Sequence, residues 1–402
     1  MRRCLGLGRT LVACVACVAC AAAVACQTEP AAQGRSPSTA RDRASAPHPT
    51  PASVDTPAAP TTDPRLDCVV AQPHAAAFAP VVRALCAELH ALDGVSASVA
   101  IAIDGQAVFS AARGPRCWGA PTPLHTSTRM RLGSITKLVT AAVVLVVARE
   151  HDVELDQPLR TTLPELTPPP TLRTLLTHSA GLRDVAAQPL LEAGEHWLPL
   201  LQSQRRDAGA HVYANASYLV LGKWIDTVAG RPFPEVFAEH PAVSALHERL
   251  TLGVTDAATA SEVGCGHRRS GAQWDPIPLA TEPPLPTWTL AAGGGIASVE
   301  DLALIPSALE RTGLRPALTR STVSTGRNDG EYGFGIRVHQ IDGRRVLAHA
   351  GKTETHAADL RWDPDQGIAV AVMSSTPQPF KATLHAAFAA AQQHPRPDIE
   401  SP

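Results

Sequence analysis

Ser134 and Lys137, three positions apart, combine residue types that can carry out acyl transfer. The chain contains only four lysines against 31 arginines, and no other Ser-x-x-Lys. A buried lysine can lose its proton and act as a base, whereas arginine stays protonated. A serine hydroxyl is a weak nucleophile until a neighbouring group can accept its proton. The pair therefore predicts a nucleophile with its base, against the alternative of a capping serine followed by a surface lysine.

The segment that carries this pair is expected to open a buried helix. Leu138–Ala148 is an unbroken apolar run whose length and alanine content favour a helix over a strand. Residues three apart share a helix face, so the serine and the lysine would meet. The free N–H groups and the dipole of the first turn favour an anion near the serine and disfavour a protonated lysine.

Two further short patterns could complete such a site. Tyr213 and Asn215 stand two residues apart, and a tyrosine beside an ammonium group can act as a general base. The asparagine could orient the lysine or a substrate carbonyl. His349 and Gly351 end a strand-like run, where a small residue would expose backbone N–H groups to a ligand. Taken singly, a tyrosine in a turn and a surface histidine explain these patterns equally well.

The elements that must position these residues are predicted as hairpins at both ends of the chain and helices between. Asp104-Gly105 joins strand-like runs near the N-terminus. Residues 152–325 are predicted to be helical and rich in loops, with a flexible loop at Gly293–Gly295 before a helix capped by Ser298. An α+β fold follows: one antiparallel sheet from N- and C-terminal strands, flanked by helices, with an inserted helical lobe and a cleft between lobes. The segments behind this prediction are helices at Phe78–Leu92, Leu172–Leu176, Ser217–Val228 and Phe380–Gln393, and strands at Val95–Ile103, Ala107–Ala111, Gly335–Ile341, Arg345–His349, Ala357–Trp362 and Ile368–Ser374.

The N-terminal residues read as an export signal followed by a tether. Residues 1–26 have a basic start, an apolar stretch too short for a confident membrane span, and Cys26 placed for lipid attachment. Residues 27–65 are rich in Ala, Pro, Ser and Thr and should be disordered. We expect a folded domain that carries the Ser134 pair over 66–394, a disordered tail over 395–402, and a cell-envelope location, periplasmic or outer-surface. A freely secreted form is the alternative to the lipoprotein.

Composition restricts cofactors and partners. The formal net charge is −2, so nothing suggests the basic face of a nucleic-acid-binding protein. No metal-ligand cluster or phosphate loop is visible, so no cofactor is expected. We expect a small-molecule or short-peptide substrate, and membrane contact only through the lipid anchor. Four of the nine cysteines lie outside the leader and could form disulfides or be buried apolar residues: Cys68, Cys86, Cys117 and Cys265.

In this order, the three patterns resemble the serine β-lactamase-related superfamily, with its Ser-x-x-Lys, Tyr-x-Asn and Lys/His-x-Gly motifs. Class C β-lactamases, D-aminopeptidases, DD-peptidases and their esterase relatives are the most similar group. The resemblance covers about residues 90–377. Further landmarks lie at Leu175–Leu182, Leu219–Gly230, Ala292–Gly295 and Tyr332–Gly335.

The resemblance implies a role for each matching residue. Ser134 would form the acyl-enzyme, while Lys137 and Tyr213 would take its proton and later activate water. Asn215 would position the lysine and the substrate. The remaining implied roles are a substrate-flanking strand at His349 and Gly351, an oxyanion hole from the N–H groups of Ser134 and Lys352, and a structural role for His178.

The main prediction is an exported serine hydrolase cleaving an ester or amide, whether a β-lactam, a D-amino-acid peptide or a carboxylic ester. Hydrolysis and transfer both remain open. The chain departs from the family at Thr355-His356, where relatives often carry a glycine and an aromatic residue. This departure motivates the alternative of a non-catalytic envelope binding or sensor protein that retains the fold. A membrane-anchored scaffold with another fold would require all three motifs to be coincidental.

Overall fold

A nine-stranded antiparallel sheet organises the part of the chain that the computed structural model describes. The described residues are 70–71, 77–92, 95–117, 121–203, 205–253, 262–271, 273–277, 286–326, 330–341 and 343–394, all within one unit, Thr61–Pro402. The predicted signal (1–26, with Cys26), the predicted tether (27–65), Cys68 and the predicted tail (395–402) lie outside the described residues.

The sheet joins strands from both ends of the sequence, as predicted. The N-terminal strand β2 (Ala97–Ile103) pairs with the C-terminal strand β14 (Ile368–Ser374), with Ala100 opposite Ala371. The strand order is β1-β3-β2-β14-β13-β12-β11-β10-β9. The other strands are β1 (Val70–Ala71), β3 (Gln106–Arg113), β13 (Ala357–Asp363), β12 (Arg344–Lys352), β11 (Arg337–Ile341), β10 (Glu331–Tyr332) and β9 (Val323–Ser324).

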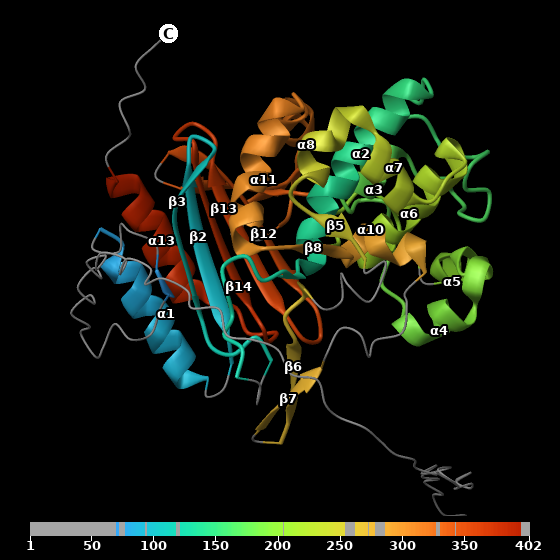
Figure 1. Ribbon diagram of the computed structural model, residues 1–402. Coiled ribbons are helices and arrows are strands. Elements are labelled where there is room, and N and C mark those ends of the chain that lie inside the picture. Colours follow the sequence, from blue (N-terminus) through green and yellow to red (C-terminus); the bar gives the residue numbers. More distant parts are fainter. Residues whose placement is uncertain are drawn as a thin grey trace, which may run out of the picture. The chain divides into compact units, whose positions relative to one another are not determined.

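Helices cover both faces of this sheet (Figure 1). Successive side chains of a strand point to opposite faces. On β2, Val99 and Ile101 therefore join the apolar cluster beneath α1 (Ala79–Ala91) and α13 (Lys381–Gln393), whereas Ala100 joins the cluster on the other face. That second face is covered by α11 (Val299–Arg311), whose N-cap is Ser298 as predicted.

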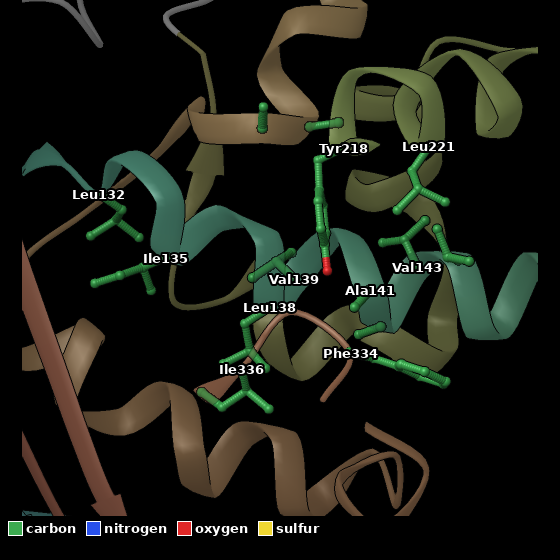
Figure 2. Close-up of a cluster of buried hydrophobic side chains, with 14 of the residues drawn as sticks. Leu132, Ile135, Leu138, Val139, Ala141, Val143, Tyr218, Leu221, Phe334 and Ile336 are labelled. Atoms are coloured by element: carbon green, nitrogen blue, oxygen red, sulfur yellow. The ribbon is translucent and has the colours of Figure 1, made fainter. Parts of the chain in front are cut away.

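The helical lobe is built around α2 (Thr136–Glu150), which is buried on nearly every side. Figure 2 shows Leu138 of α2 beside Ile336, which follows β10, and Val143 of α2 beside Leu221 of α6 (Asn215–Ala229). The buried helix predicted from the apolar run is therefore confirmed. The lobe and its connections contain α3 (Leu172–Leu176), α4 (Ala187–Glu192), α5 (Leu198–Ser203), α6 (Asn215–Ala229), α7 (Phe233–Glu239), α8 (Ser244–His247), α10 (Leu290–Gly293) and α12 (Arg315–Arg320), with 3-10 turns η1 (Gly133–Ile135), η2 (Gly194–His196), η3 (Pro241–Val243) and η5 (Thr287–Thr289).

The middle of the chain also contains strands that the sequence did not predict. A small sheet has the order β4-β8-β5, and a separate hairpin is formed by β6 and β7. The predicted flexible loop at 293–295 is wrong: Gly293 ends α10 and Gly295 begins β8. A Cβ on Gly295 would lie 2.8 Å from Thr136 Oγ1, so these glycines permit close packing. The strands are β4 (Met130–Arg131), β5 (Thr251–Leu252), β6 (Gly266–Ser270), β7 (Gln273–Ile277) and β8 (Gly295–Ala297).

A disulfide joins Cys117, in the loop after β3, to Cys265, directly before β6. Cys86 of α1 is disulfide-bonded as well. The cysteines of the described domain are thus cross-links, which decides between the two alternatives that the sequence left open. Among the described residues, every helix is too short or too polar to span a membrane.

Candidate active site

Ser134 is the central residue of η1, directly ahead of α2. The preceding residue, Gly133, has a left-handed φ of 52°, and a Cβ there would lie 2.7 Å from the backbone nitrogen of Lys352. Glycine is therefore required for the serine turn and β12 to approach this closely. Ser134 is half-buried, whereas Lys137 is fully buried. The turn places the hydroxyl at the edge of the core, with the lysine beneath it.

The ammonium group of Lys137 has three hydrogen-bond partners. Its Nζ lies 2.9 Å from Ser134 Oγ, 2.8 Å from Asn215 Oδ1 and 2.7 Å from the carbonyl oxygen of Ala292. Burial lowers the pKa of Lys137 to about 7, against an opposing effect of the Asp184 carboxylate. A large share of the lysine is then neutral near pH 7. A neutral amine can donate to Asn215 and Ala292 while its lone pair accepts the proton of the serine hydroxyl.

Tyr213 contacts both the serine and the lysine. Its hydroxyl is hydrogen-bonded to Ser134, and its ring centroid is 5.2 Å from Lys137 Nζ. Burial raises the pKa of Tyr213 to about 12, while the Ser134 hydrogen bond and the Arg337 charge act in the opposite direction. The resting phenol is therefore neutral at pH 7 and can pass a proton between its neighbours.

Asn215 is held by a carboxylate that the sequence analysis missed. Asn215 begins α6, and its Nδ2 donates to Asp184 Oδ2 at 3.2 Å. The other carboxylate oxygen accepts from the backbone N–H of Ala216 at 2.9 Å. Asp184 thereby turns the amide so that its oxygen faces Lys137. An aspartate in a loop 31 residues before the asparagine carries no sequence signal of this contact.

Strand β12 brings Gly351 and Lys352 against the serine turn. A Cβ on Gly351 would lie 1.8 Å from the carbonyl oxygen of Leu132 and 3.2 Å from the backbone nitrogen of Ser134. No side chain fits there. The backbones of Ser134 and Lys352 are consequently neighbours, the arrangement that a pair of oxyanion-binding N–H groups needs.

His349 lies on the same strand but not in the place expected of a residue lining the substrate. Its ring is 2% exposed. Its Nδ1 is 2.8 Å from the carbonyl oxygen of Ala350, and its Nε2 is 3.0 Å from Tyr332 Oη. The side chain therefore points into the interior and holds Tyr332, because strand alternation turns it away from the exposed Ala350 side.

All three tyrosines of the chain surround Lys137 or His349. Tyr218 and Tyr332 are both fully buried, and their rings lie 5.1 and 4.9 Å from the ring of His178. The Nδ1 of His178 accepts the backbone N–H of Ala214, so this histidine supports the segment that carries Tyr213. Tyrosine is scarce in this chain, and this scarcity is the sequence signal that could have identified Tyr218 and Tyr332.

The segment after Gly351, where the sequence departs from its relatives, is packed rather than open. Thr355 and His356 are only 3% and 2% exposed. A Cβ on Gly266 of β6 would lie 2.3 Å from Thr355 Cβ, and His267 N donates to the carbonyl oxygen of Thr355. The β6–β7 hairpin is thus seated against this turn. In the ranges that the structure describes, no group of three or more His, Cys, Asp or Glu residues is placed to hold a metal ion.

The chain is also similar in sequence to known proteins. A family model described as Beta-lactamase matches residues 82–394. D-aminopeptidases from Cereibacter sphaeroides (strain ATCC 17029) and Brucella anthropi are each 25% identical, over 80% and 64% of this chain. These alignments cover 64% and 52% of the two relatives, so the chain spans less than two thirds of their length.

Solved structures share the fold. The D-amino acid amidase from Ochrobactrum anthropi SV3 has a TM-score of 0.66 at 17% identity, covering 79% of this chain and 99% of that one. A class C β-lactamase from Rhodobacter sphaeroides has a TM-score of 0.62 at 18% identity, covering 78% and 99%. The predicted α+β fold of the β-lactamase and transpeptidase type is thereby confirmed.

Proposed function

Because the chain belongs to the β-lactamase family, we propose that it is an exported serine hydrolase that cleaves an ester or amide through an acyl-enzyme on Ser134. One observation carries the proposal: the buried Nζ of Lys137 lies 2.9 Å from the hydroxyl of Ser134. Both halves of an activated nucleophile are therefore present and in contact.

In the first step, Ser134 Oγ forms a bond to the substrate carbonyl carbon while its proton moves to Lys137. A pKa of about 7 suits a base working at neutral pH. The N–H groups of Ser134 and Lys352 would stabilise the resulting oxyanion. The bond to the leaving group then breaks as that group takes a proton through Tyr213, which leaves an acyl-enzyme. Water attacks it by the reverse proton path, which releases the acid and restores the serine.

The acyl group of the substrate is proposed to be apolar. A pocket of about 390 Å³ adjoins Asn215, with walls that include Leu190, Leu219 and Trp288 and with Asp184 at its edge. The relatives named D-aminopeptidase and D-amino acid amidase support a D-aminoacyl amide among the possible substrates. Nitrocefin, p-nitrophenyl esters and D-alanyl peptides, compared under the same conditions, would identify the substrate class.

The test of the reaction class is active-site labelling. A fluorophosphonate or penicillin probe should label the wild-type protein and fail to label Ser134→Ala. Ser203→Ala, which changes an exposed serine of α5, should be labelled like the wild type. Equal labelling of the wild type and Ser134→Ala would contradict the proposal. Hydrolysis of p-nitrophenyl acetate that disappears in Ser134→Ala would exclude the non-catalytic binding protein.

Export and lipid attachment at Cys26 form the second part of the proposal, with a cell-envelope location. The Cys117–Cys265 disulfide supports it, because disulfides persist mainly in oxidising compartments. Mass spectrometry of the mature N-terminus tests it.

A further inference from the structure

The histidine of the third motif does not supply the positive charge beside Tyr213. In the three-motif pattern the third motif begins with lysine or histidine, here His349. The carbonyl oxygen of Ala350 can only accept a hydrogen bond, so His349 Nδ1 carries the hydrogen. Its Nε2 then accepts from the Tyr332 hydroxyl. Burial lowers the pKa of His349 to about 3, so the ring is neutral at pH 7. Both of its nitrogens are hydrogen-bonded. His349 supplies no charge to the site.

A cation from the neighbouring strand lies close to the same tyrosine. Arg337 begins β11 and is paired with Ala348 of β12, one residue before the histidine. Its guanidinium carbon is 5.8 Å from the ring centroid of Tyr213 and 5.8 Å from that of Tyr332. Arginine stays protonated at every working pH. Arg337 therefore brings a permanent positive charge over the ring of Tyr213.

The other groups around Tyr213 do not replace that charge. Lys137 is the second cation, but it must be neutral to act as a base. Asp184 is an anion, and its charge raises the pKa of Tyr213. The remaining titratable groups packed around this ring are His178 and Tyr332, which contact it, together with His349 and Tyr218. Burial lowers the pKa of both histidines and raises the pKa of both tyrosines, so all four are neutral at pH 7.

We propose that Arg337 is a positioning residue that stabilises negative charge on Tyr213 during proton transfer and thereby takes over the task of the cation missing from His349. The inference rests on the proposed serine hydrolase activity. It acts through Tyr213, and requires no contact between Arg337 and the substrate.

The test is the pH dependence of acylation by a neutral ester, p-nitrophenyl acetate, which offers no carboxylate for an arginine to bind. A positive neighbour lowers the pKa of a phenol and of an amine alike, so its removal raises both. Arg337→Gln should therefore move the ascending limb of the pH–rate profile to higher pH by about one unit and slow acylation at pH 7 about tenfold. Arg337→Lys should keep the wild-type profile.

Two further variants separate this role from a structural one. In a Tyr213→Phe background, Arg337→Gln should cost clearly less rate than it does beside the intact tyrosine, because only its effect on the Lys137 amine is left. Arg231→Gln removes an exposed arginine paired with Glu239 beyond the far end of α6, roughly 20 Å away by helix length, and should leave the profile unchanged.

The outcomes distinguish the two proposals. A wild type that is not acylated overturns the proposed function and this inference together. An acylated wild type whose profile is unshifted in Arg337→Gln overturns the inference alone, as does a uniform loss of rate at every pH. If Arg337→Gln does not fold, a shifted profile in Arg337→Lys would contradict the proposal on its own.

Discussion

At the scale of single residues, the site depends on a lysine that is held in an unfavourable environment. Lys137 has no exposed surface, and its three hydrogen-bond partners are a hydroxyl, an amide oxygen and a carbonyl, none of them a full negative charge. Burial disfavours the ammonium form more than the nearby Asp184 carboxylate favours it. Burial of Lys137 therefore lowers the stability of the folded protein, and the same burial allows the lysine to accept a proton near pH 7.

The first prediction concerns the pH dependence of stability. The pKa of Lys137 is about 7 in the folded protein against 10.5 for the ordinary side chain, so the unfolded chain binds more protons between these values. The free energy of unfolding should therefore rise with pH over this window by up to about 1.4 kcal/mol per unit relative to Lys137→Met, and the difference should be constant below pH 7.

Denaturant unfolding of both proteins at several pH values between 6 and 10 measures this difference. Lys223→Met, which removes a lysine of α6, serves as the control and should run parallel to the wild type. Parallel curves for Lys137→Met as well would contradict the prediction.

Residue types alone predicted Ser134 as a nucleophile with Lys137 and Tyr213 as its bases, because lysine and tyrosine are rare in this chain and stand at short spacings from residues with matching chemistry. They did not indicate Asp184, Arg337 or Tyr332. Each of these acts through a contact with a residue far away in the sequence or on another strand. The sequence around such a residue does not indicate that contact.

At the scale of elements, the site is a junction between a turn and a strand. Glycines on both sides permit it: Gly133 in η1 and Gly351 in β12. The helix α2 fixes the lysine beneath the turn, and the start of α6 brings Asn215 to it. The sequence predicted these helices from apolar spacing, but it placed a flexible loop at Gly293–Gly295, where the glycines serve close packing.

The second prediction follows from this junction. Gly351→Ala should push β12 away from the serine turn, because the added Cβ has no room beside the Leu132 carbonyl. The loss of one aligned oxyanion donor costs about 100-fold or more in rate. We expect acylation by p-nitrophenyl acetate to fall by at least that factor while the protein still folds, as judged by circular dichroism.

Ala350→Ser is the matched control, since residue 350 is exposed on the same strand and should accept a hydroxyl with little effect. Wild-type acylation in Gly351→Ala would show that this strand does not set the geometry of the oxyanion site.

At the scale of the whole molecule, the ends and the middle of the described domain contribute different parts of the site. The strands near its two ends form the sheet that contains β12, while the part between them supplies α2, α6 and the loop that carries Asp184. The Cys117–Cys265 bridge ties the loop after β3 to the hairpin that covers the turn at Thr355 and His356. A cross-link of this kind is consistent with the export proposed from the N-terminal residues.

The third prediction belongs to this scale. In a bacterial host with lipoprotein processing, the mature protein should begin at a lipid-modified Cys26 and stay with the membrane fraction. Cys26→Ser should abolish the modification and release the protein, whereas Cys20→Ser, in the same leader, should not. An unmodified N-terminus at Gln27 or Cys26 in the wild type would contradict the lipid anchor.

The sequence by itself predicted the reaction type, because the chemistry of a serine, a lysine and a tyrosine is local to those residue types and their spacing. It also determined the buried helix and the terminal hairpins, because these follow from short-range periodicity. Only the tertiary structure decided which groups surround Lys137 and Tyr213, since burial and charge depend on contacts between distant segments: the Lys137 partners Asn215 and Ala292 lie 78 and 155 residues away in the sequence. The same folding turned His349 inward and brought Arg337 over Tyr213.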